Sequence, residues 1–190
     1  MKILAFAGSA RATSHNRRLL SIACEALREL EITVNDFDFR QFPMPLYDGD
    51  LEQASGLPEN ARLFKQALRE HDGFVIASPE YNSAYSPLLK NAIDWASRAE
   101  NSDEPPLSAF TNKTALLIAT SPGALGGLRG LSALRTLLGN INVHVLPKQL
   151  AIPRAHEAFS EQGELSSPDQ MKNLTLLMDD FIDFTRRLTA

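Results

Sequence analysis

The sequence predicts a three-layer α/β fold in which a parallel sheet is covered by helices on both faces. Two observations favour this fold class. Short apolar runs such as residues 73–78 and 113–120 are typical of strands that are buried on both sides. These runs alternate along the chain with longer segments whose apolar residues recur at helical spacing. Because strict alternation gives parallel strands joined by right-handed crossovers, we expect a doubly wound sheet.

Five strands and five helices are expected to follow one another from the N-terminus. In the first helix Leu19, Ala23 and Leu27 lie on one face, and Pro58 and Pro168 suit the first turns of later helices. The strands are expected at 3–7, 33–39, 73–78, 113–120 and 142–146, and the apolar faces of the helices within 19–30, 58–68, 87–99, 128–138 and 168–188. Five parallel strands of this kind suit the flavodoxin-like order 2-1-3-4-5.

Two stretches carry neither a helical nor a strand period. Residues 40–56 are expected to form a long loop because Pro43, Pro45 and Gly49 interrupt them, and long loops inside compact domains are often functional. Residues 154–167 are a polar segment between the last strand and the last helix. With 190 residues in all, one domain over residues 1–190 is the simplest expectation.

The composition argues against several classes of protein. A net charge of −4, with basic residues only in isolated pairs, argues against a nucleic-acid partner. No apolar run approaches the roughly 20 residues that cross a bilayer, so we expect no membrane association. The first residues lack a secretory pattern, which indicates the cytoplasm. The four His are scattered without ligand spacing, so we expect no metal site.

The single cysteine, Cys24, permits no internal disulfide and lies beside the apolar face of the first helix. We interpret it as a small buried side chain. A cysteine-based phosphatase loop is excluded, because such a loop needs an Arg at the position where Leu30 stands.

Polar loops follow strands one, three and four, and all three are expected to open at the same edge of the sheet. The first loop joins a buried strand to a helix, so its backbone N–H groups and the positive helix end form an anion site. The loop also supplies the hydroxyls of Ser9 and Ser14, the amide of Asn16 and the cation of Arg11. This combination predicts a phosphate group at the first loop.

The other two loops indicate what carries that phosphate. Neither the glycine spacing of a dinucleotide fingerprint nor the Gly-Lys-Ser/Thr ending of a P-loop is present, which leaves a compact mononucleotide site. In the second loop Tyr81 offers an apolar plate and Asn82 an amide. In the third loop Gly123, Gly126 and Gly127 allow close approach of the backbone. A flavin ring between these two loops fits the available groups.

The three loops resemble those of the NADPH-dependent FMN reductase family, the flavodoxin-like quinone, azo and chromate reductases. The motifs are Gly8-Ser9-x-Arg11-x-x-Ser14-x-Asn16-Arg17, then Pro79-Glu80-Tyr81-Asn82 with Lys90-Asn91-Ala92-Ile93-Asp94-Trp95, and finally Ser121-Pro122-Gly123 with Gly126-Gly127-x-Arg129. The resemblance runs from residue 3 to about residue 150. By position it implies a phosphate site of Ser9, Arg11, Ser14 and Asn16, a ring border of Pro79, Glu80, Tyr81 and Asn82, and a polar ring edge closed by Ser121, Gly123 and Gly126.

The resemblance also implies non-covalent FMN, NADPH or NADH as the hydride donor, and a homodimer or homotetramer packed through the third helix. Hydride would pass to FMN and then to a quinone-like or other small acceptor in a ping-pong mechanism. Since the cofactor carries this chemistry, no side chain is expected to be catalytic.

Two alternatives stay open. A flavodoxin-type electron carrier is disfavoured by Arg11 and by the modest net charge. A reductase that releases reduced FMN to a partner protein is the other. Some of the motif residues also have simpler interpretations: Ser14 and Asn16 as helix caps, Glu80 as half of an ion pair between subunits, and Arg129 as a subunit contact rather than a ligand of the NADPH phosphate.

Overall fold

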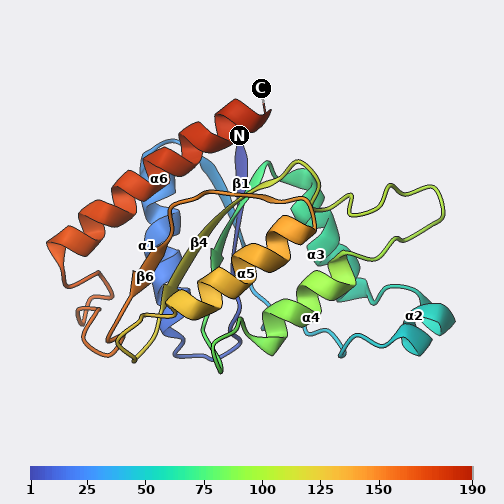
Figure 1. The fold of residues 1–190 in the computed structure, drawn as a ribbon, viewed down its shortest axis with the longest axis horizontal. Coiled ribbons are helices and arrows are strands. Elements are labelled where there is room, and N and C mark those ends of the chain that lie inside the picture. The colour runs from blue at the N-terminus through green and yellow to red at the C-terminus, as the bar shows by residue number, and fades with distance from the viewer. Residues whose placement is uncertain (190) are drawn as a thin grey trace.

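The computed structural model describes residues 1–189. Its strands are β1 (Lys2–Ala7), β2 (Thr33–Phe37), β3 (Gly73–Ala77), β4 (Thr114–Thr120), β5 (His144–Val145) and β6 (Leu150–Ile152). Its helices are α1 (His15–Glu29), α2 (Gly49–Ser55), α3 (Glu59–Glu70), α4 (Pro87–Ala96), α5 (Leu128–Asn140) and α6 (Pro168–Thr189). The strands lie between the helices in a twisted sheet (Figure 1).

The sheet has the order β2-β1-β3-β4-β5, with β6 as a further partner of β4, and each of these pairs is parallel. The flavodoxin-like order predicted from the alternation is therefore confirmed. In this order the direction of winding reverses between β1 and β3. Ligands of such sheets bind beyond the carboxyl ends of the strands near that reversal, which is where the polar loops of this chain lie.

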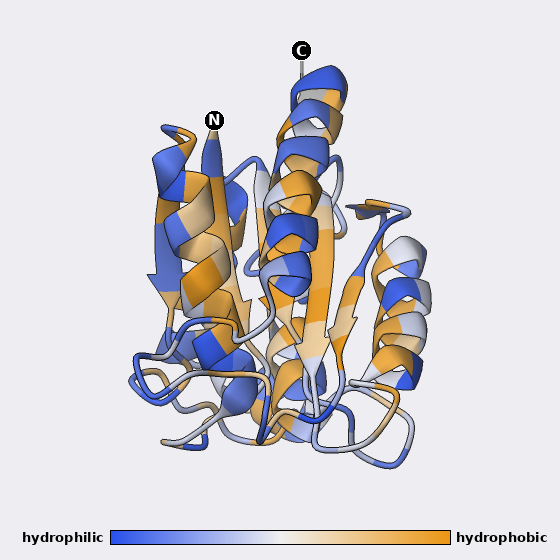
Figure 2. Cartoon of the chain, turned by 90° about the vertical axis from the view of Figure 1, so that its left-hand side faces the viewer, coloured by the Kyte–Doolittle hydropathy of each residue, from blue (hydrophilic) through white to orange (hydrophobic). Residues whose placement is uncertain are grey.

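Two hydrophobic cores lie on opposite faces of the sheet, because successive side chains of a strand point to opposite sides. Ala5 and Val75 face α1 and α6, whereas Phe6 and Ile76 face α3, α4 and α5. Phe6 meets Phe64 of α3 edge to face with ring centroids 5.3 Å apart, a contact worth roughly 0.5–1.5 kcal/mol beyond burial. Figure 2 shows the same division, with hydrophobic strands behind helices whose outer surfaces are hydrophilic.

The fifth strand differs from the prediction of one strand over residues 142–146. Only His144–Val145 pairs with the start of β4, and the chain returns to the end of β4 as Leu150–Ile152. The prediction placed this strand correctly, although its paired part is shorter, but it missed β6. Pro147 has no N–H group and cannot extend the ladder, so the chain leaves the sheet and rejoins it three residues later.

The predicted loop over residues 40–56 is wrong in its second half, where α2 forms. The side chain of Asp48 caps this helix by accepting hydrogen bonds from the N–H groups of Asp50 and Leu51. None of the α2 residues is buried, so the helix leaves no apolar period in the sequence. The first half of the loop is tied to α4 by a 2.8 Å hydrogen bond from Trp95 Nε1 to the carbonyl of Pro45.

The remaining helices lie close to their predicted positions. α3 begins after Pro58 and α6 begins at Pro168. α4 ends at Ala96, a little before the predicted end, because the N–H and the hydroxyl of Ser97 both bond to the carbonyl of Asp94. Within residues 1–189, no helix has both the length and the apolarity that crossing a membrane requires.

Candidate functional site

Three loops meet at the carboxyl edge of the sheet: loop one (residues 8–14), loop two (residues 78–86) and loop three (residues 121–127). Gly8 N–H donates to the carbonyl of Ala77 at the end of β3 (2.9 Å). Ser78 N–H donates to the carbonyl of Ile118 in β4 (3.0 Å). The loops are thus fastened to neighbouring strands, and the structure brings together the three segments that the sequence singles out.

Loops one and two approach each other most closely at Gly8. A Cβ atom at this position would lie 2.9 Å from Ser86 Oγ and 3.3 Å from Pro79 Cδ. Both distances are shorter than ordinary carbon contacts, so only glycine lets the two loops pack in this way. The turn directly after β1 is therefore also the point at which loops one and two come into contact.

The hydroxyl groups of loop one are held in place by the backbone of the loop itself. Ser9 is buried, and its Oγ accepts a hydrogen bond from Arg11 N–H (3.3 Å). Ser14 is the N-cap of α1, and its Oγ accepts from Arg17 N–H (3.3 Å). In both cases the hydroxyl proton is still available to a ligand. Ser14 is therefore a helix cap that can also donate to a phosphate oxygen.

Asn16 has a structural contact that sequence reasoning missed. Its amide donates to the carbonyl of Thr120 (2.9 Å) and accepts from the N–H of the same residue (3.0 Å). The side chain is almost fully buried, with 5% of its residue surface exposed. These two bonds join the start of α1 to the end of β4 and leave one amide N–H for any ligand.

The two arginines of the loop-one motif have different surroundings. Arg11 is exposed, and within residues 1–189 its guanidinium makes no hydrogen bond or ion pair. Arg17 is paired with Asp38 at 2.6 Å. A hydrogen bond from Arg40 lowers the pKa of Asp38 to about 2; burial opposes this shift and Arg17 adds to it. Arg17 therefore pairs with the Asp38 carboxylate, whereas Arg11 is the loop-one cation that can bind an anion.

Loop two contains a tight turn. Tyr81 and Ala84 exchange backbone hydrogen bonds of 2.9 and 3.1 Å, and the two residues between them, Asn82 (φ 52°) and Ser83 (φ 67°), are left-handed. Two such residues are typical of a type I′ turn. The turn holds Tyr81 at the surface with 51% of the residue exposed, so its ring is open to a ligand.

Glu80 turns its carboxylate toward the start of α5. It accepts a 3.0 Å hydrogen bond from Gly130 N–H and pairs with Arg129 at 2.6 Å. Burial raises the pKa of Glu80, but the bonds from Gly130 and Arg129 outweigh it and leave the pKa below its usual value. The ion pair considered for Glu80 therefore lies within the chain, and it occupies both Glu80 and Arg129.

Two glycines of loop three are required by close packing against neighbouring strands. Gly126 has φ 62°, and a Cβ atom there would lie 2.6 Å from the carbonyl carbon of Ile152 in β6. Gly127 has φ 95°, and its Cβ atom would lie 2.8 Å from Ala119 Cβ. Gly123 differs, since its nearest such neighbour is Ser121 Oγ at 3.7 Å. Gly123 and Ser121 are thus the loop-three residues with room for a ligand.

The 154–167 segment contributes to the site, which the sequence analysis did not predict. Phe159 lies parallel to the ring of His15, with centroids 6.1 Å apart, and the guanidinium of Arg18 lies over the Phe159 ring at 5.4 Å from its centroid. Burial lowers the pKa of His15, and the nearby charges of Arg18, Arg11 and His156 lower it further. A single aromatic residue in a polar segment was the only signal of this contact.

The groups present fit FMN. A phosphate needs hydroxyl and N–H donors beside a cation, and loop one supplies Ser9, Ser14 and the unpaired Arg11 at a helix N-terminus. A planar ring needs an open aromatic face and backbone without side chains in the way, and Tyr81 and Gly123 supply these. In the part of the chain that the structure describes, no three His, Cys, Asp or Glu side chains gather as a metal ligand set would.

Comparison with known proteins identifies the family. The sequence model of NADPH-dependent FMN reductase matches residues 1–157. A 2-hydroxy-1,4-benzoquinone reductase of Burkholderia sp. is 33% identical over 188 residues, which cover 98% of this chain and 97% of that protein. An NAD(P)H-dependent FMN reductase of Pseudomonas aeruginosa is 35% identical over 167 residues, which cover 87% of this chain and 84% of that protein.

The structural comparison agrees. FerB, a flavoenzyme NAD(P)H:(acceptor) oxidoreductase from Paracoccus denitrificans, superposes with a TM-score of 0.82 at 25% identity, covering 98% of this chain and 97% of that one. These findings confirm the resemblance inferred from the three loop motifs, together with the enzyme class and with FMN and NAD(P)H as its cofactor and co-substrate. The chain belongs to the NADPH-dependent FMN reductase family.

Proposed function

We propose that this chain is an FMN-dependent NAD(P)H oxidoreductase that reduces quinones or small acceptors of similar chemistry. The observation that carries the proposal is the pairing, at one sheet edge, of a loop with an unpaired arginine and free hydroxyls and a turn that exposes Tyr81. The names of the relatives, among them a benzoquinone reductase, support the choice of acceptor. When bound, FMN supplies the two-electron chemistry, accepting hydride from NAD(P)H and passing it to the acceptor.

In this proposal the residues of loop one and of the first turn of α1 contribute to phosphate binding in different ways. Arg11 pairs with it, the hydroxyls of Ser9 and Ser14 donate to it, and Gly8 lets the backbone turn beneath it. Asn16 acts mainly through Thr120, by holding the start of α1 against β4 so that the N–H groups of the first turn point into the site.

Loops two and three hold the ring. Pro79, Tyr81 and Asn82 border it, while Ser121 and Gly123 lie at its polar edge, where fixed N–H dipoles stabilise developing negative charge. Glu80 supports this border without contacting the ring, because its carboxylate is bonded to Gly130 and Arg129 of α5. Gly126 supports it by packing closely against Ile152 of β6. No side chain is assigned as a catalytic acid or base.

The test begins with an absorbance spectrum of the purified protein and a titration with FMN that follows flavin fluorescence. Anaerobic addition of NADPH, and separately of NADH, should bleach the flavin, and a benzoquinone should restore its colour. Initial rates at several quinone concentrations should give parallel double-reciprocal lines.

Bleaching without turnover would favour an electron carrier instead. Loss of FMN on gel filtration after reduction would favour a protein that releases its flavin. Absence of FMN binding would overturn the proposal.

The assembly and location are part of the same proposal. We expect one domain that forms a homodimer or homotetramer through α4, in the cytoplasm. A surface hollow of about 370 Å³ between α4 and α5, lined in part by Ile93, Leu137 and Ile141, supports an interface on this side. Light scattering during gel filtration measures the mass, and a monomer at micromolar concentration would contradict the expectation.

A further inference from the structure

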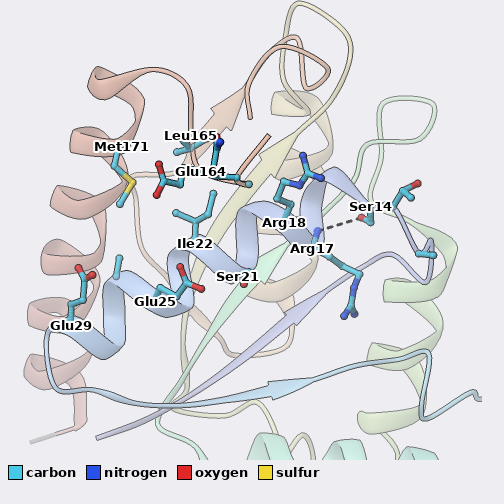
Figure 3. A pocket seen from close by; sticks show the side chains of 15 residues that line it. Ser14, Arg17, Arg18, Ser21, Ile22, Glu25, Glu29, Glu164, Leu165 and Met171 are labelled. Carbon is cyan, nitrogen blue, oxygen red and sulfur yellow. Dashed lines mark hydrogen bonds between the residues drawn. The ribbon is translucent and has the colours of Figure 1, made fainter. Parts of the chain in front are cut away.

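A groove of about 760 Å³ begins at loop one and follows the outer side of α1 (Figure 3). One wall is α1 itself, and the other is formed by residues 162–165 and by Met171 near the start of α6. None of the residues that line it belongs to loop two or loop three. The groove is therefore separate from the place proposed for the flavin ring, and its volume is in the range of small-molecule sites.

The groove is continuous with the proposed phosphate site. Thr13 and Ser14 belong to loop one and also line the groove. A ligand whose phosphate is held by loop one can thus extend along α1 without leaving the protein surface. FMN ends at its phosphate and cannot do so, whereas a flavin dinucleotide continues from that phosphate through a second one.

A free cation stands at the near end of the groove. Arg18 is fixed over the ring of Phe159 at 5.4 Å, and Phe159 is in turn stacked on His15. Figure 3 shows Arg17 and Arg18 pointing away from each other. Arg17 is bound by Asp38, whereas no carboxylate pairs with Arg18 within residues 1–189. Arg18 is therefore placed and available for a second phosphate.

The far part of the groove has a different character. It is lined by apolar and acidic side chains, namely Ile22, Leu165, Met171, Glu25, Glu29 and Glu164. The apolar residues suit the faces of a base, and carboxylates accept hydrogen bonds from ribose hydroxyls and from an amino group. The same carboxylates repel phosphate, so anionic groups belong at the Arg18 end. The order of groups along the groove is that of an adenosine 5′-phosphate.

We infer that this groove is an adenylate subsite, which allows the flavin site to bind FAD as well as FMN. The second phosphate of FAD lies at Arg18, and its adenosine lies against Ile22 and Leu165. The inference rests on the proposed function, because it places the first phosphate in loop one. It adds a ligand class and a binding surface to that site.

The test compares FMN and FAD on the purified full chain after removal of any bound flavin. Arg18→Gln removes the cation, and Ser21→Phe fills the groove from an exposed position that lines it. Arg28→Gln, an exposed residue of the same helix outside the groove, is the matched control. Dissociation constants come from flavin fluorescence, competition by 5′-AMP is measured against both flavins, and thermal melts confirm folding.

The dissociation constant of the wild-type chain for FAD should be no more than about tenfold that for FMN. In addition, 5′-AMP should compete with FAD more than with FMN. Arg18→Gln should weaken FAD roughly tenfold, the loss typical of a hydrogen bond to a charged group, and FMN much less. Ser21→Phe should weaken FAD and leave FMN unchanged, and Arg28→Gln should change neither.

Other results overturn the inference. The subsite is absent, while the proposed function stands, if FMN binds but FAD does not. The same conclusion follows if neither Arg18→Gln nor Ser21→Phe changes the affinity for FAD. If Ser21→Phe raises the KM for NADPH and leaves FAD affinity unchanged, the groove serves the adenosine half of the hydride donor. If neither flavin binds, the inference falls together with the proposed function.

Discussion

Loops one and three lie at the same edge of the sheet but use their small and polar residues for different purposes. In loop one the side chains that face outward, Arg11 and Ser14, keep groups free for a ligand. In loop three Gly126 and Gly127 are required by packing against β6 and β4. Two loops with equally suggestive sequences therefore differ in what a substitution should damage. Substitution of Arg11 or Ser14 should weaken binding, and substitution of Gly126 or Gly127 should lower stability.

The largest expected effect comes from Gly126→Ala. The new Cβ atom would lie 2.6 Å from the Ile152 carbonyl carbon in a left-handed backbone, so we expect a loss of about 2–4 kcal/mol in the free energy of unfolding. Urea denaturation of the purified variant measures it. Gly123→Ala is the matched control and should cost less than about 1 kcal/mol, because its Cβ atom meets nothing closer than 3.7 Å. Equal losses in the two variants would remove the distinction drawn for loop three.

Asn16→Ala tests whether the first turn of α1, directly after loop one, contains a structural residue. The substitution leaves the buried N–H and carbonyl of Thr120 without their partner, which should cost about 1–3 kcal/mol of unfolding free energy. Denaturation and FMN titration are measured on the same sample. A variant with native stability but lost FMN binding would show that Asn16 is a direct phosphate ligand, contrary to the role proposed here.

Arg11→Ala should have the opposite signature. We expect FMN affinity to fall roughly 10–150-fold, as for the loss of a hydrogen bond to a charged group, and the free energy of unfolding to change by less than about 0.5 kcal/mol. Fluorescence titration gives the affinity, and Arg11→Lys, which keeps the charge, should retain part of it. Unchanged affinity in Arg11→Ala would mean that another group holds the phosphate.

The smallest effect concerns His15, the first residue of α1, which Phe159 of the 154–167 segment contacts. Its folded pKa lies below the ordinary 6.5 because burial and the charges of Arg18, Arg11 and His156 disfavour the protonated ring. The unfolded chain then binds more protons as the pH falls, so this contribution to stability is present above pH 6.5 and is lost below it.

Thermal melts of His15→Gln and of the wild type between pH 7.5 and pH 5 check this effect. The wild type should lose more stability over that interval than the variant. Identical pH profiles would show that the contact between His15 and Phe159 is not coupled to protonation.

The elements of this fold also differ in whether the sequence alone could predict them. Apolar runs and helical periods located β1, β3, β4 and most helices, because burial of a strand or of a helix face leaves a local pattern. The identity of the three loops followed from their place after those strands. In contrast, α2 buries no residue and β6 has only three residues, so neither left a periodic signal.

The sequence by itself determined the alternation of the main strands and helices, the sheet edge at which the polar loops gather, and the residue types that favour a phosphate there. Only the tertiary structure decided which of those residues remain free. Asn16 is joined to a residue 104 positions away, Gly126 packs against Ile152, and Phe159 covers His15. Such partners are brought together by the folding of the whole sheet. Because these contacts depend on distance in space rather than along the chain, no local sequence pattern could predict them.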